Sequence, residues 1–156
     1  MGNSLAASVA SLGLVLPQPA VPRASYEPWV KVGKTLYISG QVAKHNDEYP
    51  YVGRLGRELD VEAGRAAARL CALAILAQLD AAISGDLRRL QRCVRLTGYV
   101  NATPEFVEHP RVIDGASELI VQVLGEAGRH ARTAVGLSSL PRGVAVEVEA
   151  IFELSE

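Results

Sequence analysis

The sequence predicts an α+β fold in which two helices cover one face of a mixed β-sheet. Apolar and acidic residues alternate over 144–153, as in a strand with one buried face. Small and aliphatic residues recur at spacings of three and four between Asp60 and Ser84, as in a long amphipathic helix. The complete order, strand, strand, helix, strand, helix, strand, strand, places both helices between strands.

The chain has the length of a single domain, with 156 residues. Its first part, 1–25, differs in composition from 26–156. Leu5, Val9 and Leu12 recur near helical spacing, and three prolines follow between positions 17 and 22. Prolines remove backbone donors and fix an extended path. We therefore expect an N-terminal helix and a proline-rich arm laid over the domain.

Residues 29–39, WVKVGKTLYIS, are rich in β-branched and aromatic residues and predict two short strands. The glycine and lysine at 33–34 are placed to form the turn. Gly40 and Gln41 are expected to end the hairpin. The polar stretch 44–58 contains glycines and a proline and predicts a loop.

Asp60 is predicted to cap the long helix, because its carboxylate can accept backbone N–H bonds that the first turn leaves unpaired. The helix is expected to end near Ser84 and Gly85. Many alanines on one face indicate a close approach to the sheet. The predicted buried stripe is Ala63, Ala66, Ala67, Leu70, Leu73, Ala74, Ala77 and Ala81.

Residues 93–100 predict the next strand. Alternation places Cys93, Arg95, Thr97 and Tyr99 on one side and Val94, Leu96, Gly98 and Val100 on the other. A loop at 101–113 precedes a second helix at 115–124, which Gly125 is expected to end. The predicted buried stripe of that helix is Ala116, Leu119, Ile120 and Val123.

The alternation between two faces is clearest in the last predicted strand, 144–153. One predicted face carries Val144, Val146, Val148, Ala150 and Phe152, and the other carries Ala145, Glu147, Glu149, Ile151 and Glu153. Helices cover one face of the sheet, so the opposite face would expose Cys93, Thr97, Tyr99 and Ile151. We infer that this face packs against other copies of the chain in a closed oligomer.

Charge and composition narrow the function classes. The net charge is −1 with 16 Lys and Arg scattered among 17 Asp and Glu, so no basic field favours a nucleic acid. Cys71 and Cys93 lie too far apart for a metal knuckle or redox pair, which favours a reduced, cytoplasmic setting. Charges or prolines interrupt every apolar run before the roughly 18 residues of a membrane span. The amino terminus lacks the basic region of a signal peptide.

Three blocks of the sequence resemble the signature blocks of the RidA/YjgF-like reactive-intermediate deaminases, also known as endoribonuclease L-PSP-like proteins. They are SYEPWVKVGKTLYISGQV at 25–42, ARTAVGLSSLP at 131–141 and VEVEAIFE at 146–153. The resemblance implies a chorismate-mutase-like α+β fold, a homotrimer whose sheets form a central barrel, and ligand clefts between subunits. It also implies cofactor-free hydrolysis of enamines and imines, such as 2-aminoacrylate and 2-iminopropanoate, to 2-oxo acids and ammonia.

Arg132 stands where the family has an arginine that holds the substrate's carboxylate. A guanidinium presents a planar fork of donors that matches a carboxylate, so the resemblance implies that Arg132 binds a small-molecule carboxylate. The alternative, from the residues alone, is an ion pair with Glu147 or Glu149 on the last strand. The flanking blocks favour ligand binding.

Glu147 follows Arg132 by the spacing that separates the family's arginine and acidic residue. Imine hydrolysis needs a positioned water and a group that accepts its proton, which a partly buried carboxylate can do if its pKa moves toward neutrality. We predict Glu147 as this catalytic base. Glu149 shares its face and is equally consistent with a solvated or ion-paired strand residue.

Other positions match the family less directly. Tyr26 precedes Ser39 by thirteen positions, as a family tyrosine does, and is either a wall of the cleft or an ordinary aromatic anchor. Gly40 permits a close approach of the ligand, or only makes a turn. Asp114 lies near a family asparagine, with a one-residue gap in the match. Ala134 stands where many members carry a cysteine, so no thiol is available there.

Three functions therefore remain open. In the first, the protein is an imine deaminase with Arg132 as clamp, Glu147 as water activator and Tyr26 as cleft wall. In the second, the same trimer binds carboxylate metabolites without catalysis. In the third, His130 beside Arg132 serves a ribonuclease. His45, His109 and His130 are not spaced as a metal site, so no metal is predicted.

Overall fold

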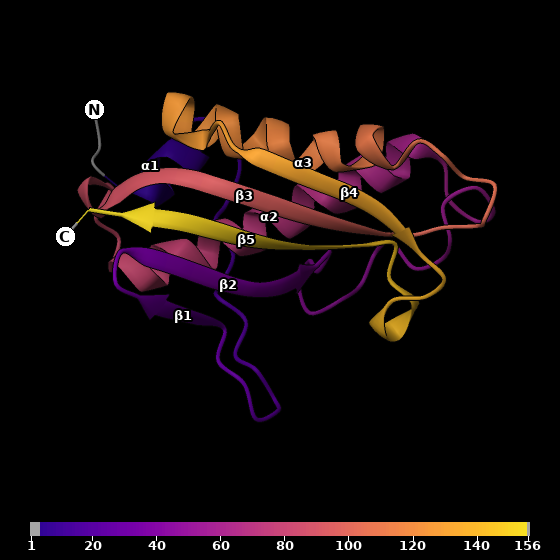
Figure 1. The fold of residues 1–156 in the computed structure, drawn as a ribbon, viewed down its shortest axis with the longest axis horizontal. Helices are drawn as coiled ribbons and strands as arrows, with labels where there is room; N and C mark the ends of the chain where they lie inside the picture. Colours follow the sequence, from indigo (N-terminus) through magenta and orange to yellow (C-terminus); the bar gives the residue numbers. More distant parts are fainter. Residues whose placement is uncertain (1–3, 156) are drawn as a thin grey trace.

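The computed structural model describes residues 4–155 as a five-stranded sheet with helices on one face (Figure 1). In chain order the elements are α1 Leu5–Ala10, β1 Trp29–Val32, β2 Thr35–Val42, α2 Val61–Ile83, β3 Leu90–Asn101, α3 His109–Leu124, β4 Ala131–Leu137 and β5 Val146–Leu154. The strand order is β1-β2-β5-β3-β4, and only β3 and β4 pair in parallel. This arrangement confirms the predicted α+β fold and its order of elements.

The two long helices form the second layer. α2 and α3 contact each other; in Figure 1 α2 runs behind the strands and α3 lies along the upper edge of the sheet, and the core fills the space between the layers. Fully buried side chains of α2, β3, α3 and β5 meet in this core, including Leu76, Leu96, Ile113, Leu119 and Phe152. α3 joins the parallel strands β3 and β4, because a parallel pair needs a crossover connection.

The first hairpin matches the prediction except at its end. Val32 pairs with Thr35 across a two-residue turn, in which Gly33 takes a φ of +59°. The prediction that Gly40 and Gln41 end the hairpin is wrong, since β2 continues to Val42. The register against β5 shifts between Ile38 and Gln41, and pairing resumes at Gln41 beyond this bulge.

α2 begins and ends as predicted. Asp60 Oδ1 accepts a hydrogen bond from the Ala63 amide at 2.8 Å, and Ser84 ends the helix in the left-handed region at φ +57°. The predicted buried stripe is wrong in part, because Ala81 is exposed while Gly64 and Ile75 are buried. The sheet and α3 contact α2 on different sides, so burial covers much of the helix rather than one narrow stripe.

The expectation that no apolar run approaches the length of a membrane span needs correction at α2. By length and composition alone this helix, Val61–Ile83, is long and apolar enough to cross a membrane. However, 61% of its most apolar window is buried inside the fold, where it contacts the sheet and α3. A core helix of a soluble domain has the same properties.

α3 begins at His109, six residues before the predicted start, so the predicted loop at 101–113 is shorter. Pro110 lies in the first turn, where its missing N–H costs no helical hydrogen bond. The predicted buried stripe of this helix is confirmed, and Gly125 ends it with a φ of +61°. The sequence prediction therefore placed Pro110 wrongly in a loop, because proline is also common in the first turn of a helix.

A β-bulge in β3 overturns one predicted face. Cys93 pairs with Phe152 and Arg95 pairs with Ile151, so Val94 is an extra residue on β3. Cys93 is fully buried and Val94 is 40% exposed, opposite to the prediction from simple alternation. Beyond the bulge, Thr97 and Tyr99 lie on the face away from the helices, as predicted.

β5 starts at Val146, two residues later than predicted, and then alternates between buried and half-buried residues as expected. Ala145 was predicted on the exposed face but is fully buried. Its amide donates to the Tyr51 carbonyl at 3.0 Å, and its carbonyl accepts from the Asn101 amide at 2.9 Å. Chain segments on both sides therefore cover it.

The amino-terminal segment packs onto the same core. Leu5 and Val9 of α1 are fully buried, and the Ala20 carbonyl accepts a hydrogen bond from Gln78 Nε2 at 2.8 Å. Residues 1–3 of the predicted segment 1–25 lie outside the described residues. The division of the chain into 1–25 and 26–156 stays a prediction.

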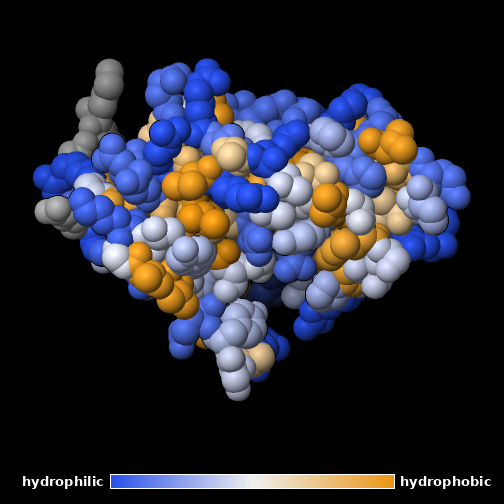
Figure 2. Space-filling model, in the orientation of Figure 1, coloured by the Kyte–Doolittle hydropathy of each residue, from blue (hydrophilic) through white to orange (hydrophobic). Residues whose placement is uncertain are grey.

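Within the described residues 4–155, no helix covers the other face of the sheet, which faces the viewer in Figure 1. The space-filling view of this face shows apolar patches among charged side chains (Figure 2). Exposed apolar side chains on the strands are Val30, Val32, Tyr37, Val94, Val135 and Leu137. We call this surface the open face.

Candidate functional site

Arg132 is the second residue of β4, an edge strand, and its side chain turns toward α3. It is only 23% exposed. Its Nη1 donates to Asp114 Oδ1 at 2.7 Å and to Ser117 Oγ at 3.3 Å, both on α3. Among residues 4–155 its Nε and Nη2 donate to no hydrogen-bond acceptor. This leaves the side-on edge of the guanidinium, which can bond a carboxylate through two parallel hydrogen bonds.

Asp114 holds Arg132 and is itself held from α2. Arg65 Nη1 lies 3.8 Å from Asp114 Oδ2, and Arg65 Nη2 bonds both oxygens of Glu118 at 3.0 and 2.8 Å. The ion pairs therefore run from α2 through α3 to β4. The alternative partners for Arg132 are wrong, because it pairs with Asp114 rather than with Glu147 or Glu149.

Glu147 lies on β5 beside Gly40 of β2. A Cβ atom built on Gly40 would lie 2.9 Å from Glu147 Cδ and nearer still to Oε1. The carboxylate thus occupies the space that a side chain at position 40 would fill. Gly40 is required for this placement because any larger residue would displace the Glu147 carboxylate.

Burial raises the pKa of Glu147 above the ordinary value of a glutamate, and the nearby Glu149 carboxylate raises that pKa further. Glu149 accepts a hydrogen bond from the Tyr99 hydroxyl at 3.1 Å. Burial first, and then Glu149, also raises the pKa of Tyr99. Glu147 thus has the half-buried setting and raised pKa of a candidate base, while Glu149 has a protein partner.

Arg132 and Glu147 face opposite sides of one sheet. Leu96 of β3 pairs with Arg132, and Tyr99 of β3 pairs with Glu147, three residues along the same strand. Leu96 is buried under the helices, whereas Tyr99 lies on the open face. A three-residue offset reverses the face in a strand. One chain therefore does not bring its Arg132 and Glu147 to the same ligand.

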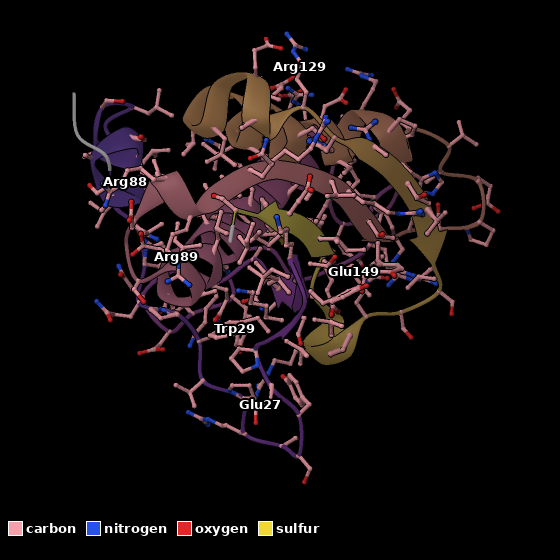
Figure 3. The ribbon with its side chains drawn as sticks, turned by 60° about the vertical axis from the view of Figure 1, so that its left-hand side comes forward. Glu27, Trp29, Arg88, Arg89, Arg129 and Glu149 are labelled. Carbon is pink, nitrogen blue, oxygen red and sulfur yellow. The ribbon has the colours of Figure 1, made fainter. Side chains whose placement is uncertain are left out.

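Tyr26 lies in the segment that leads into β1, and this segment projects away from the sheet (Figure 1). Tyr26 is 57% exposed. Its neighbour Glu27 lies on the projecting part in Figure 3, and the Glu27 carbonyl accepts a hydrogen bond from Ser39 Oγ at 2.7 Å. The anchored segment leaves the Tyr26 side chain exposed to solvent.

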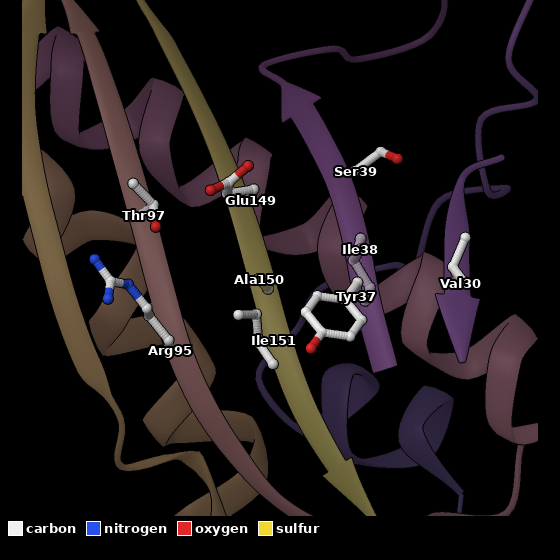
Figure 4. A pocket seen from close by; sticks show the side chains of 9 residues that line it. All are labelled: Val30, Tyr37, Ile38, Ser39, Arg95, Thr97, Glu149, Ala150 and Ile151. Atoms are coloured by element: carbon white, nitrogen blue, oxygen red, sulfur yellow. The ribbon is translucent and has the colours of Figure 1, made fainter. Parts of the chain in front are cut away.

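The open face also has a shallow hollow between β2, β5 and β3 (Figure 4). Its lining includes Tyr37, Arg95, Thr97, Glu149 and Ile151. Arg95 Nη2 donates to Thr133 Oγ1 of β4 at 2.7 Å. The hollow lies on the Glu147 side of the sheet and adjoins Ser39, the residue before Gly40.

The contact between Ser117 and His130, two polar residues beside Arg132, was not predicted from the sequence. Ser117 Oγ lies 2.9 Å from His130 Nε2 and also accepts the Arg132 bond. Ser117 follows Asp114 by three residues on one helix face, and His130 precedes Arg132 by two residues. These spacings are the sequence signal for each pair, and they indicate the cluster only once α3 is known to pack beside β4. No three His, Cys, Asp or Glu side chains within residues 4–155 are grouped as metal ligands.

Gly40→Ala is predicted to move the Glu147 carboxylate while leaving the fold intact, because the close atoms belong to the end of a flexible side chain. The displaced carboxylate should gain solvent, so the pKa of Glu147 should fall toward its ordinary value. Carboxyl NMR titration measures this shift, and Tm should change little. The control is Ala43→Gly, a buried core position just beyond β2, which should leave the Glu147 titration unchanged. An unchanged Glu147 titration in Gly40→Ala would contradict the assignment.

Comparisons with known proteins agree with this architecture. Residues 6–152 match the family model described as "YjgF/chorismate_mutase-like, putative endoribonuclease". Protein TCP17 of Trypanosoma cruzi is 47% identical over 152 residues, which are 97% of this chain and 94% of TCP17. The match therefore extends over almost the whole chain.

Two solved structures have the same fold. Atu1372 from Agrobacterium tumefaciens, a protein of unknown function, is 45% identical with a TM-score of 0.91, covering 97% of this chain and 92% of that one. RidA from Psychrobacter sp. PAMC 21119 is 29% identical with a TM-score of 0.57, covering 87% and 93%. The expected chorismate-mutase-like fold is confirmed, and the chain belongs to the RidA/YjgF-like family.

Proposed function

We propose that this protein hydrolyses reactive 2-imino and 2-enamino acids to 2-oxo acids and ammonia, without a cofactor, in clefts between the subunits of a homotrimer. The observation that carries the proposal is the Arg132 guanidinium. Asp114 and Ser117 fix one end of it, and its Nε–Nη2 edge stays available for a carboxylate. Free, buried cysteines fit a cytoplasmic location for this chemistry.

The reaction needs few groups once the acid end is held. An enamine such as 2-aminoacrylate first takes a proton at C3 and becomes the imine. Water then adds to C2 of the protonated imine and loses a proton, giving a neutral carbinolamine. The nitrogen then takes up a proton, the C–N bond breaks as ammonia leaves, and the hydroxyl loses its proton as the carbonyl forms. Glu147 accepts the proton of the attacking water, as its half-buried setting and raised pKa favour.

The trimer supplies the second half of the site. Arg132 and Asp114 lie on the helix side at the β4 edge, whereas Gly40 and Glu147 lie on the open face. A ligand that contacts both groups must therefore bridge two chains. Packing the open face of one chain against the β4 edge of the next brings them together and buries the exposed apolar side chains of that face. The projecting Tyr26 segment then closes the cleft.

The test is release of 2-oxo acid and ammonia from 2-aminoacrylate generated in situ from serine by β-elimination. We expect the wild type to exceed the spontaneous rate and Glu147→Gln to lose about 10²–10⁴-fold in rate, the usual contribution of a positioned base. Glu149→Gln is the matched control on the same strand and should retain most of the rate. A Glu147→Gln protein with full activity would reject the base assignment.

The pH dependence of the rate further distinguishes the roles of the Glu147 and Glu149 carboxylates. A base acts only when ionised, so the rate should fall as pH drops through the pKa of Glu147, which lies above its ordinary value. Glu149→Gln removes a nearby negative charge, so the acid limb should move to lower pH. The kcat/KM profiles of the two proteins measure this shift, and a limb that stays in place would contradict the coupling.

The second candidate is a trimer that binds small carboxylates without catalysis. The Arg132 edge favours it equally, since a clamp serves both functions. If Arg132→Ala raises the Kd for pyruvate, while wild type does not accelerate 2-oxo acid release, this candidate replaces the first.

The third candidate is an endoribonuclease, the activity named for the matching family model. His130 contacts Ser117 Oγ and is therefore engaged within the protein. Absence of labelled-RNA binding at low salt would remove that third function.

A further inference from the structure

His130 has both ring nitrogens engaged at close range. Nδ1 lies 2.6 Å from the Gly128 carbonyl oxygen, in the 3₁₀ turn Gly125–Gly128, and Nε2 lies 2.9 Å from Ser117 Oγ. Ser117 Oγ in turn accepts the Arg132 Nη1 bond at 3.3 Å. A continuous hydrogen-bonded chain therefore runs from Gly128 through His130 and Ser117 to Arg132.

The acceptors in this chain fix the proton positions. A carbonyl oxygen only accepts, so His130 Nδ1 carries a proton in every charge state. In the neutral ring Nε2 is then the acceptor, and Ser117 donates its hydroxyl proton to it. In the charged ring Nε2 donates to Ser117 Oγ, and the serine proton becomes free to point toward a ligand. The charge on His130 thus reverses the direction of the serine hydroxyl.

The surroundings of His130 make its charge sensitive to a bound anion. Burial lowers the pKa of His130, the positive Arg132 of β4 lowers it further, and the Gly128 bond opposes both. The other charges nearby have partners of their own: Asp114 of α3 binds Arg132, and Arg129 binds Glu126 at 3.1 Å. Arg92 of β3 donates to the Arg129 carbonyl at 3.4 Å. A carboxylate on Arg132 would offset the one cation that acts directly on His130.

We infer that Ser117 and His130 are positioning residues of the Arg132 clamp, and that His130 takes up a proton when a carboxylate binds there. The inference rests on the proposed function, because it uses the same clamp. Neutral His130 fixes Ser117 and through it one end of the guanidinium. Charged His130 turns the serine hydroxyl outward, where it can supply a further donor to the anion. Binding and protonation then reinforce each other.

Isothermal titration with pyruvate tests this coupling. Measured in two buffers of different ionisation heat, wild type should take up a fraction of a proton per bound pyruvate at pH values near and below the ordinary histidine pKa of about 6.5, because the pKa of His130 is lowered in the free protein. The bound state holds more protons, so Kd should fall as pH falls across this range. His130→Gln should bind without that proton uptake, and Ser117→Ala should raise Kd about tenfold. His45→Gln, remote from the clamp, should behave as wild type.

NMR of the ligand-free protein provides a readout that a merely structural role would not move. Ring nitrogen shifts of His130 should report the Nδ1–H tautomer, and Arg132→Ala should raise the pKa of His130. Pyruvate binding without proton uptake, or an Nε2–H tautomer, would overturn this inference while leaving the proposed function intact. If wild type binds no pyruvate at all, the clamp itself fails, and both proposals fail with it.

Discussion

Arg132→Ala should reduce kcat/KM for 2-aminoacrylate by about 10²–10⁴-fold, because two charge-assisted hydrogen bonds contribute roughly 1.5–3 kcal/mol each. The variant loses the Nε–Nη2 edge that, in the proposed function, holds the acid end of the substrate beside the Glu147 carboxylate of the next chain. Its fold should survive, since β4 is an edge strand and the side chain is partly exposed. The measurement is the initial rate of 2-oxo acid release above the spontaneous rate.

Arg65→Ala is the matched control for this variant. Arg65 also lies within 4 Å of Asp114, at 3.8 Å, but its strong partner is Glu118 on α3 rather than a ligand. Its removal should leave the rate within a few-fold of wild type. Equal losses in the two variants would mean that the ion-pair network, and not the clamp, governs activity. Retained activity in Arg132→Ala would remove the carboxylate clamp from the mechanism.

The fold was predictable because its periodic signals are local. Asp60, Gly125 and the alternation in β5 act over a few residues and were placed correctly. The errors arise where tertiary contacts override such signals. The bulge at Val94 depends on how β3 pairs with β5, and no residue type at that position announces it.

The sequence proposes candidate site residues but does not show how they are arranged in space. The motif located Arg132 and Glu147, yet their opposite faces follow from the order β4-β3-β5 together with a three-residue offset. Sequence spacing carries neither fact, because it does not say which strand lies between two others. The Ser117–His130 contact was missed for a related reason, since helix and strand periodicities had to be combined across α3 and β4.

Gly115→Ala should lower the free energy of unfolding by about 1–3 kcal/mol, although alanine favours helices by up to roughly 1 kcal/mol over glycine. A Cβ on Gly115 of α3 would lie 2.9 Å from the carbonyl carbon and 3.0 Å from Cα of Arg65. Those atoms are backbone, so α2 and α3 must separate to accommodate the methyl group. Urea denaturation measures the loss through the midpoint at unchanged m-value.

Gly64→Ala provides the control, because it places a methyl group in the same helix pair against side chains. Its Cβ would lie 2.8 Å from Leu55 Cδ1 and 3.0 Å from both Val112 methyl carbons, which can change rotamer. The loss should therefore be smaller than for Gly115→Ala. Separation of the helices would also shift Asp114, the neighbour of Gly115, and so loosen Arg132. If Gly115→Ala is as stable as wild type, the close helix contact is not required, and the placement of the clamp by this helix pair is wrong.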